Sequence, residues 1–416
     1  MNTTISRRAA VAALATAVLA GAATPAMAAA PAMAASSAKA ASSAQDRPEL
    51  RKAMNAFVDA GFTGIQLRVR DQQGDWAAGA GVRKLGSAAK PPADGSFWAG
   101  SITKTFTATM VLQLVAEGRI GLDSPAADYL PGYGLDERIT VRMLLRHTSG
   151  IFNYTGEYNP DGTMDEPGIP ANGDEWVPNR FNSYKPEELV RLALSKKPRF
   201  EPGTQWSYSN TNYTVALLLI ENVTGHSYAT ELKRRITGPL GLRGTLAAGN
   251  RTTALPGPHT HGYYQYKDRV IDLSHQNLSL LTGAGDLIST TQDLATFFSA
   301  LNGGKLLPAP LLAEMRTAIP TSIPRQDYGL GIWAQDLGPG CGTVYQHNGS
   351  PPHGYGALMY SSPDGSKTLT ASVTWLDSAT RGSAKDFLTL VDALVKQEFC
   401  DTPTGQTRPD NPGSAF

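Results

Sequence analysis

A serine and a lysine three residues apart, Ser101 and Lys104, are the first residues of this chain whose types and spacing suggest chemistry. A serine hydroxyl is unreactive at neutral pH and needs a nearby base, and a lysine whose pKa is lowered can accept its proton. Residues three apart on a helix share a face, so the spacing brings amine and hydroxyl together without a long-range contact. Two other Ser-x-x-Lys copies begin at Ser36 and Ser87, so the pattern alone also fits a capping serine followed by a solvated lysine.

Only the copy at Ser101 opens a convincing helix. Phe106, Met110 and Leu114 follow at i, i+4 and i+8, in a segment without Gly or Pro until Gly118. This period is typical of a helix with one apolar face. We therefore expect the serine and the lysine on its first turn.

Two further motifs lie downstream, and each occurs once in the chain: Tyr208-Ser209-Asn210 and His347-Asn348-Gly349. The phenol of Tyr208 can relay a proton, and Asn210 points the same way if the segment is extended. Gly349, on a predicted strand edge, would let a substrate backbone approach closely. Alone, the motifs equally fit a turn before a helix and a buried structural histidine. Together, in this order, they indicate a serine acyl-transfer enzyme.

Other catalytic arrangements fit the sequence less well. No Gly-x-Ser-x-Gly occurs, which argues against the nucleophile elbow of α/β-hydrolases. His259 and His261 have no third metal ligand near them, and His147 has the position of a structural residue at a helix end. We found no phosphate-cradling glycine loop. We therefore expect no metal and no organic cofactor.

The composition and the two ends of the chain indicate a secreted protein. The formal net charge is only +1, and the chain has no long basic run, which disfavours partners such as nucleic acid or a membrane surface. Residues 1–34 have the pattern of a signal peptide, of the general or the twin-arginine type, with an apolar run too short for a stable membrane anchor. A flexible leader at 35–48 and a disordered tail at 401–416 are expected. In an exported chain, the two cysteines, Cys341 and Cys400, most simply form one disulfide, the alternative being two buried thiols.

The order of predicted elements favours an α/β (α+β) fold. Residues 49–124 and 286–400 are expected to form an antiparallel sheet flanked by helices, with a mainly helical region, 125–285, inserted between them. Residues 151–186 are expected to be an irregular functional loop. The predicted strands are 64–71, 76–84, 329–335, 342–347, 356–361 and 369–375. The predicted helices are 101–117, 139–147, 211–221, 286–301 and 384–399.

These motifs resemble the serine β-lactamase and penicillin-binding superfamily, in which Ser-x-x-Lys is followed by Tyr-x-Asn and then by Lys- or His-x-Gly. The histidine is similar to that of secreted DD-carboxypeptidase/transpeptidases and D-stereospecific amidohydrolases of the class C β-lactamase-like branch. The likeness extends over residues 47–400, including Gly100–Phe106, Tyr208–Tyr213, Ile288–Leu294, Tyr328–Gly331 and both cysteines. It implies a β-lactamase-like fold.

The resemblance also implies a role for each site residue. Ser101 would be the acylated nucleophile and Lys104 its proton acceptor, with Tyr208 assisting proton transfer. Asn210 would bind the substrate amide, and His347 would complete the cleft beside Asn348 and Gly349. The backbone N–H groups of Ser101 and Ser350 would form the oxyanion hole.

Two departures from this pattern concern the group that a carboxypeptidase would grip. Relatives carry an arginine before the third motif and a threonine within it, whereas this chain has Trp333 and Asn348, with Ser350 as the later residue. An arginine fork is the natural partner of a free carboxylate, so its loss favours an uncharged group there. Alternatively, the alignment slips by a residue, or Arg325 compensates.

The sequence therefore predicts a secreted, monomeric serine hydrolase that cleaves D-configured peptide, amide or ester bonds through an acyl-enzyme. One version is a D-alanyl-D-alanine carboxypeptidase with possible transpeptidation or aminolysis, and β-lactams are expected to acylate it. The alternative is a D-stereospecific amidohydrolase or esterase acting on uncharged C-termini. A β-lactamase and a non-catalytic penicillin-binding sensor are weaker readings, because nothing establishes fast deacylation and no receptor module is attached.

Overall fold

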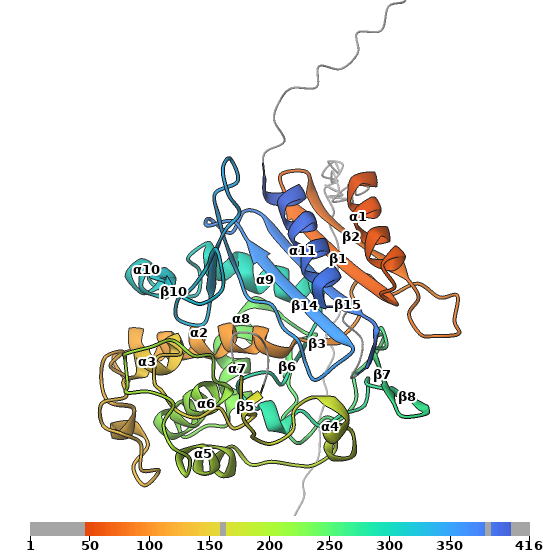
Figure 1. The fold of residues 1–416 in the computed structure, drawn as a ribbon. Coiled ribbons are helices and arrows are strands. Elements are labelled where there is room, and N and C mark those ends of the chain that lie inside the picture. Colours follow the sequence, from red (N-terminus) through yellow and green to blue (C-terminus); the bar gives the residue numbers. More distant parts are fainter. Residues whose placement is uncertain (1–45, 159–163, 379–383, 401–416) are drawn as a thin grey trace, which may run out of the picture. The chain divides into compact units, whose positions relative to one another are not determined.

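The main sheet takes its strands from both ends of the chain. The computed structural model describes residues 46–158, 164–378 and 384–400 (Figure 1). Within them, an eight-stranded sheet runs in the order β10-β11-β12-β13-β14-β15-β1-β2, with antiparallel neighbours throughout. Its strands are β1 (Gly64–Asp71), β2 (Gly74–Gly81), β10 (Ile319–Pro320), β11 (Gln326–Tyr328), β12 (Trp333–Asp336), β13 (Thr343–Gln346), β14 (Tyr355–Ser361) and β15 (Thr368–Thr374). The expected fold class is confirmed.

Helices cover both faces of this sheet. Ile65, Leu67 and Val69 of β1 are buried in one apolar cluster with α1 (Pro48–Asp59) and α11 (Ala384–Phe399). On the other face, α9 (Thr291–Asn302) packs against β1, β14 and β15 (Figure 1). Because both faces are covered, every residue of β14 and β15 is buried.

The helix that carries Lys104 lies between this sheet and a helical region. α2 (Thr103–Ala116) is preceded by a one-turn 3-10 helix, η1 (Gly100–Ile102). Phe106, Met110 and Leu114 are fully buried, but so are most other residues of α2, so the helix has no solvent-facing side. The predicted helix is thus present, but the hydrophobic core surrounds it, whereas the sequence suggested a single apolar face.

The segment expected to be mainly helical holds α3 to α8. Their bounds are α3 (Val141–Arg146), α4 (Gly173–Asn179), α5 (Pro186–Leu194), α6 (Asn210–Thr224), α7 (Tyr228–Leu232) and α8 (Gly238–Leu240). Short turns of 3-10 or π helix are η2 (Ala126–Tyr129), η3 (Lys233–Thr237) and η4 (Ser279–Leu281), and α10 (Ala309–Arg316) lies later in the chain. The domain bounds stay a prediction, since the described residues all belong to one structural unit.

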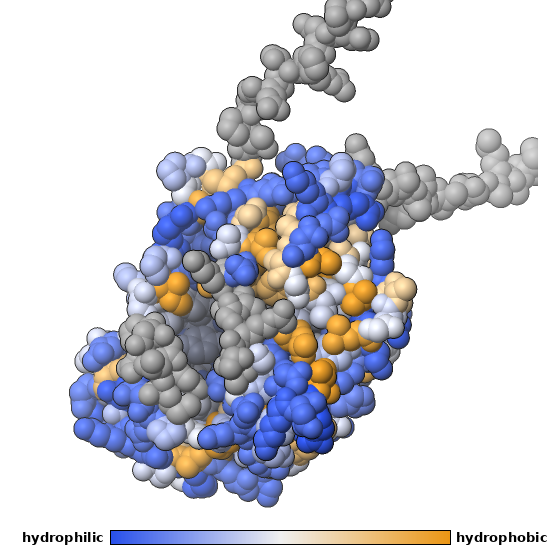
Figure 2. Space-filling model, turned by 45° about the vertical axis from the view of Figure 1, so that its right-hand side comes forward, coloured by the Kyte–Doolittle hydropathy of each residue, from blue (hydrophilic) through white to orange (hydrophobic). Residues whose placement is uncertain are grey.

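Small sheets join distant segments around the larger one. One has the order β3-β9-β6, one has the order β16-β7-β8, and β4 pairs with β5. Their bounds are β3 (Phe97–Trp98), β4 (Glu157–Tyr158), β5 (Met164–Glu166), β6 (Leu246–Ala247), β7 (Tyr263–Tyr266), β8 (Arg269–Asp272), β9 (Leu287–Ser289) and β16 (Leu376–Ser378). The face in Figure 2 is hollowed, with hydrophilic and hydrophobic side chains interspersed around the hollow.

One helix was missed, and two predicted elements need correction. α1 was not predicted, although Leu50, Met54 and Phe57 repeat at helical spacing and are buried. The expected helix 286–301 is strand β9 followed by α9, which begins where the Thr290 side chain accepts a hydrogen bond from the Asp293 N–H at 3.2 Å. The loop 151–186 is only partly irregular, since it contains β4, β5 and α4.

The predicted signal peptide 1–34, most of the leader 35–48 and the tail 401–416 lie outside the described residues. Among the helices of the described ranges, none combines the length and the apolar character needed to cross a membrane.

Candidate active site

The turn Gly100–Ile102, which carries the predicted nucleophile Ser101 and is called the nucleophile turn below, depends on a glycine. Gly100 has a φ of +54°, a left-handed conformation that glycine adopts without steric cost. A β-carbon there would lie 2.9 Å from the backbone nitrogen of Ser350, so the position also requires a residue without a side chain. Ser101 follows in η1, partly exposed, while Lys104 lies on the first turn of α2.

Lys104 is buried with its amine held against the serine. Its side chain is 0% exposed, and Nζ lies 3.1 Å from Ser101 Oγ. Nζ also donates to Asn210 Oδ1 and to the backbone oxygen of Ala284, both at 2.8 Å. Burial lowers the pKa of Lys104 well below its ordinary value, because the ammonium form would lose its hydration. A neutral amine has two N–H groups, and since two carbonyl oxygens accept them, its lone pair is left for the Ser101 hydroxyl.

Tyr208 reaches the same hydroxyl from the residues just before α6. Its ring centroid lies 4.6 Å from Lys104 Nζ, and Tyr208 lines the same cavity as Ser101. Burial raises the pKa of the Tyr208 phenol, and the neighbouring Ser101 hydroxyl opposes that shift. The phenol therefore stays protonated at neutral pH and holds a proton beside the serine oxygen.

Asn210 is the first residue of α6 and is fixed on several sides. Its backbone N–H donates to Asn153 Oδ1 at 3.0 Å, and its Nδ2 donates to Thr155 Oγ1 at 3.2 Å. Since its Oδ1 accepts from Lys104, Asn210 orients the base as well as lining the cavity described below.

His347 is buried next to Lys104. Its side chain is almost fully inaccessible, with Nε2 3.2 Å from the Tyr328 hydroxyl and Nδ1 2.9 Å from the backbone oxygen of Asn348. Burial, with a smaller contribution from Lys104, lowers the pKa of His347 to about 3, and the contact with the Asn348 oxygen opposes this shift. His347 is therefore a neutral support for the site at neutral pH.

Gly349 permits a close approach, but of the protein's own backbone. A β-carbon at Gly349 would lie 1.8 Å from the backbone oxygen of Ala99 and 3.1 Å from the backbone nitrogen of Ser101. The sequence suggested that this glycine would admit a substrate backbone. Its observed partner is the turn that carries Ser101, which it brings against the segment with the third motif, just beyond β13.

Two backbone N–H groups meet where this contact is made. The N–H of Ser350 donates no hydrogen bond within the described chain. The N–H of Ser101 stands in the first turn of a helix, where backbone donors have no intrahelical partner. The pair lies where Gly100 packs against Ser350 and Gly349 packs against Ser101, and it can receive a developing negative charge on a carbonyl oxygen.

A cavity of about 440 Å³ opens over these groups. Its described lining includes Ser101, Tyr208, Asn210 and Ser350 from the predicted site. The other lining residues are Thr155, Ala171, Asn172, Leu281, Ala284, Gly285, Pro351, Pro352, His353 and Asp377. No lysine or arginine belongs to this lining as far as the structure describes it.

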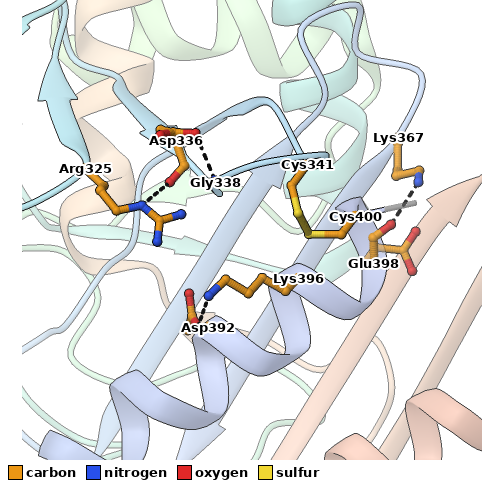
Figure 3. Close-up of a disulfide and its surroundings, with 9 residues drawn as sticks. All are labelled: Arg325, Asp336, Gly338, Cys341, Lys367, Asp392, Lys396, Glu398 and Cys400. Atoms are coloured by element: carbon orange, nitrogen blue, oxygen red, sulfur yellow. Dashed lines mark hydrogen bonds and ion pairs between the residues drawn. A yellow bond between two sulfur atoms is a disulfide. The ribbon is translucent and has the colours of Figure 1, made fainter. Parts of the chain in front are cut away.

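The remaining predicted residues lie away from the cavity wall. Trp333 is only 7% exposed and packs edge-on against Tyr328, with ring centroids 4.6 Å apart. Asn348 points to the opposite face of the sheet, where its Nδ2 donates to the Tyr360 hydroxyl at 2.7 Å. Arg325 donates from Nε to the backbone oxygen of Asp336 near the disulfide, so it does not replace the absent arginine (Figure 3).

Sequence reasoning missed a carboxylate that fixes the loop beside Lys104. Asp286 accepts hydrogen bonds from the backbone N–H groups of Gly283 at 3.0 Å and Gly249 at 3.1 Å. This holds the turn that presents the Ala284 oxygen to the lysine. Burial raises the pKa of Asp286 to about 6. No local spacing marks this residue, because its partners come from separate segments.

Two histidines also have roles that their motifs did not reveal. His147 Nδ1 accepts from the Ser209 N–H at 3.2 Å, and its ring lies 4.4 Å from that of Tyr208, so this helix-end residue supports the tyrosine. His353 lines the cavity beside Asp377, with Nδ1 2.8 Å from the carboxylate. Across the described ranges, no group of three or more His, Cys, Asp or Glu is arranged to hold a metal ion.

Comparison with known proteins adds a family and several relatives. The Beta-lactamase family model matches residues 50–393. A D-stereospecific amidohydrolase from Streptomyces sp. has a similar solved structure, with a TM-score of 0.72, 36% identity, and coverage of 86% of this chain and 99% of that chain. The D-amino acid amidase of Ochrobactrum anthropi SV3 matches with a TM-score of 0.71, 25% identity, and coverage of 84% and 97%.

Curated relatives match at lower identity. The putative penicillin-binding protein PbpX of Bacillus subtilis is 28% identical over 315 residues, which is 76% of this chain and 71% of that protein. Penicillin-binding protein 4* of the same organism is 28% identical, with 66% of this chain matching 59% of its length.

Proposed function

Since this chain belongs to the Beta-lactamase family of serine hydrolases, we propose that it is a D-stereospecific amidohydrolase that acts through an acyl-enzyme on Ser101. The preferred substrates are D-configured amides, with esters and peptides of uncharged C-terminus as related donors. The observation that carries this choice is the cavity lining, whose described residues include no lysine or arginine to bind a carboxylate.

The proposed reaction starts from a neutral Lys104. Its lone pair takes the Ser101 proton while Oγ attacks the substrate carbonyl carbon, and the carbonyl oxygen gains negative charge. The N–H groups of Ser101 and Ser350 stabilise that charge, which in comparable enzymes contributes roughly 3–4 kcal/mol per donor. The carbon–nitrogen bond then breaks, and the proton passes from Lys104 through the Tyr208 phenol to the leaving amine. The Nζ–Oγ distance of 3.1 Å and the distance of 4.6 Å between Lys104 Nζ and the Tyr208 ring centroid support this route.

The acyl-enzyme is released by reversal of the same steps. Water, or a second amine, gives its proton to the unprotonated Lys104 as it attacks the acyl carbon, and Ser101 Oγ recovers a proton as it leaves. Because the same cavity admits either nucleophile, hydrolysis and aminolysis are both expected. β-Lactams are expected to acylate Ser101, since they present a strained amide to the same groups.

A D-alanyl-D-alanine carboxypeptidase or transpeptidase is the second candidate. The matches to PbpX and to penicillin-binding protein 4* favour it. This activity requires a side chain that binds the terminal carboxylate of the substrate, and neither Trp333 nor Arg325 lies at the cavity to do so. We also propose export through residues 1–34. The disulfide Cys341–Cys400 supports export, because such bonds persist in oxidising compartments.

Turnover of matched D-substrates tests the proposal. The initial rates are measured for N-acetyl-D-Ala-D-Ala and for its C-terminal amide, with L-configured analogues and the Ser101→Ala variant as controls. A higher kcat/KM for the amide, lost in Ser101→Ala and absent for L-analogues, is expected. Preference for the free acid would instead establish the carboxypeptidase, and full activity of Ser101→Ala would disprove the nucleophile.

A further inference from the structure

The cavity wall holds one carboxylate that the proposed reaction does not use. Asp377, in β16, lines the same cavity as Ser101, and its side chain is 17% exposed. It is the only acidic residue in the described lining, which holds no lysine or arginine. Among the residues that the structure describes around this cavity, no cation compensates the carboxylate, and desolvation of a charge is costly unless something compensates it.

The hydrogen bonds of His353 show that it does not supply that compensating charge. Its Nε2 accepts the backbone N–H of Gly173 at 2.7 Å, so Nε2 carries no proton. The ring hydrogen must therefore be on Nδ1, which donates to Asp377 Oδ2 at 2.8 Å. With one ring proton the imidazole is neutral, and the pair keeps the full negative charge of the carboxylate.

This pair is built into the fold rather than placed loosely on the surface. The His353 ring lies 4.2 Å from that of Tyr264 and 5.4 Å from that of Trp176, and its side chain is only 11% exposed. His353 also has a φ of +82°, a conformation that is unfavourable for a residue with a side chain and persists only where the surroundings impose it. The carboxylate is thus held at a set place on the cavity wall.

Asp377 still has capacity to bind a ligand. Its Oδ1 accepts the Ser378 N–H at 2.9 Å and its Oδ2 accepts from His353, whereas an ionised carboxylate offers about four lone-pair sites. An ammonium group presents three donors and a positive charge, which suit these sites. A substrate carboxylate would be repelled from the same wall, in agreement with the preference for amides.

We infer that Asp377, positioned by His353, binds an ammonium group of the substrate and makes the enzyme prefer cationic D-configured amides. This inference rests on the proposed amidohydrolase function and names the charge of its substrate. The ammonium group comes either from the free α-amine of the D-residue or from a side chain such as that of D-lysine. The two sources share one chemistry and differ in their distance from the scissile carbonyl.

Three amides separate these sources: D-leucinamide, N-acetyl-D-leucinamide and N-acetyl-D-lysinamide. For the unmodified enzyme, kcat/KM should be about tenfold or more higher for one of the two cationic amides than for the uncharged one. The cationic amide that is preferred identifies the source of the ammonium group. Asp377→Asn should abolish that preference, so that its kcat/KM for the cationic amide becomes equal to its kcat/KM for N-acetyl-D-leucinamide.

A matched control is available elsewhere in the chain. His261 Nδ1 lies 2.7 Å from Asp272 Oδ2 in the same kind of pair, away from the cavity, so Asp272→Asn should keep the preference. Should Asp377→Asn fail to fold, the unmodified enzyme still gives a test. Added salt should lower kcat/KM for the preferred cationic amide and leave that of the uncharged amide unchanged.

The outcomes distinguish this inference from the function on which it rests. Equal kcat/KM for all three amides, or a preference that survives in Asp377→Asn, would overturn the role of Asp377 while the Ser101-dependent amidase remained. Absence of Ser101-dependent turnover of every amide would instead remove the proposed function, and the inference with it.

Discussion

The hairpin of β12 and β13 is held in different ways at its two ends. At the catalytic end, Trp333 packs on Tyr328, and Gly349, just beyond β13, lies against the nucleophile turn. At the other end, Cys341 in the hairpin turn is bonded to Cys400, directly after α11 (Figure 3).

The polar groups near the two ends also differ in exposure. Lys104 and His347 are buried at the catalytic end, where loss of hydration lowers both pKa values. Near the disulfide, Lys396 and Asp392 form an ion pair at 2.8 Å with side chains 38% and 47% exposed. Such surface pairs contribute about 0–1 kcal/mol. The comparison teaches that packing at one end sets the chemistry, whereas a covalent bond at the other end secures the fold.

The largest expected effect is the loss of the buried base. Lys104→Met should lower kcat by a factor of about 10⁴ or more, because among the described residues Lys104 is the base held against Ser101 Oγ. Methionine has a similar volume, so the variant should remain folded. Amide turnover measures the loss of kcat, and a thermal unfolding curve shows whether the variant is folded. Lys396→Met is the control from the disulfide end, and a comparable loss of activity there would contradict the distinction between the ends.

Removal of the disulfide should have the next largest effect, on stability alone. The bond joins residues 59 positions apart, and the chain-entropy relation gives about 4 kcal/mol for a loop of this size. The double variant Cys341→Ser, Cys400→Ser should lose about that much free energy of unfolding in urea. Its kcat/KM, measured well below the unfolding transition, should match that of the unmodified enzyme. A selective fall in kcat would show that the disulfide also positions the site.

Gly349→Ala should reduce catalysis by about a hundredfold. Its β-carbon would overlap the Ala99 backbone oxygen and push the nucleophile turn away from Ser350. The control is Gly342→Ala in the hairpin turn, where φ is +73° and no atom lies within 4 Å of the added carbon. That variant should lose only about 1 kcal/mol of stability and no activity. Similar kcat values for both variants would count against the close contact.

The buried histidine should make the protein less stable in acid. The folded pKa of His347 is about 3, below the value of about 6.5 for the unfolded chain. As pH falls below about 6.5, the unfolded state binds a proton that the folded state does not, so stability decreases toward pH 3, by roughly 2 kcal/mol at pH 5. Asp286, with a folded pKa of about 6, acts in the opposite direction between about pH 6 and 4.

Paired urea titrations at pH 7 and pH 5 isolate the contribution of His347. His347→Gln should reduce the loss of stability between these two pH values, whereas substitution of the exposed His226 by Gln should not. An unchanged pH dependence in His347→Gln would mean that this histidine is not held neutral.

The smallest effect is expected at Asn348. Asn348→Ala removes the hydrogen bond to the Tyr360 hydroxyl and should cost about 1 kcal/mol of stability. Its kcat/KM values for amide and free-acid substrates should change less than about twofold, since the side chain faces away from the cavity. A change in the ratio of those two kcat/KM values would show that Asn348 contributes to substrate binding.

Features that depend on neighbouring residues could be predicted from the sequence. One helical turn separates Ser101 from Lys104, so their contact at 3.1 Å follows from local geometry. Alternating apolar residues in β1 likewise indicated a strand with one face in a core. The predictions failed where a local pattern was ambiguous: the apolar run 286–301 fits a helix throughout, yet its first part pairs as β9 with β3 and β6.

Other features exist only in the tertiary structure. The depressed pKa of Lys104 needs the burial that surrounding elements provide, and the amine is held by Asn210 and Ala284, which are 106 and 180 residues away. The same holds for the His353–Asp377 pair, whose charge depends on a backbone N–H at Gly173. The partners of His347 and Asn348 are likewise distant in sequence or on another strand: His347 contacts the Tyr328 hydroxyl, and Asn348 donates to the Tyr360 hydroxyl.

The sequence by itself therefore determined the class of fold and the contact between Ser101 and Lys104, because helical and strand periodicity act over a few residues. Tertiary structure alone decided which charges the cavity presents and which candidate residues reach it. The physical reason is that desolvation and close packing depend on every segment that surrounds a group, and those segments are distant along the chain.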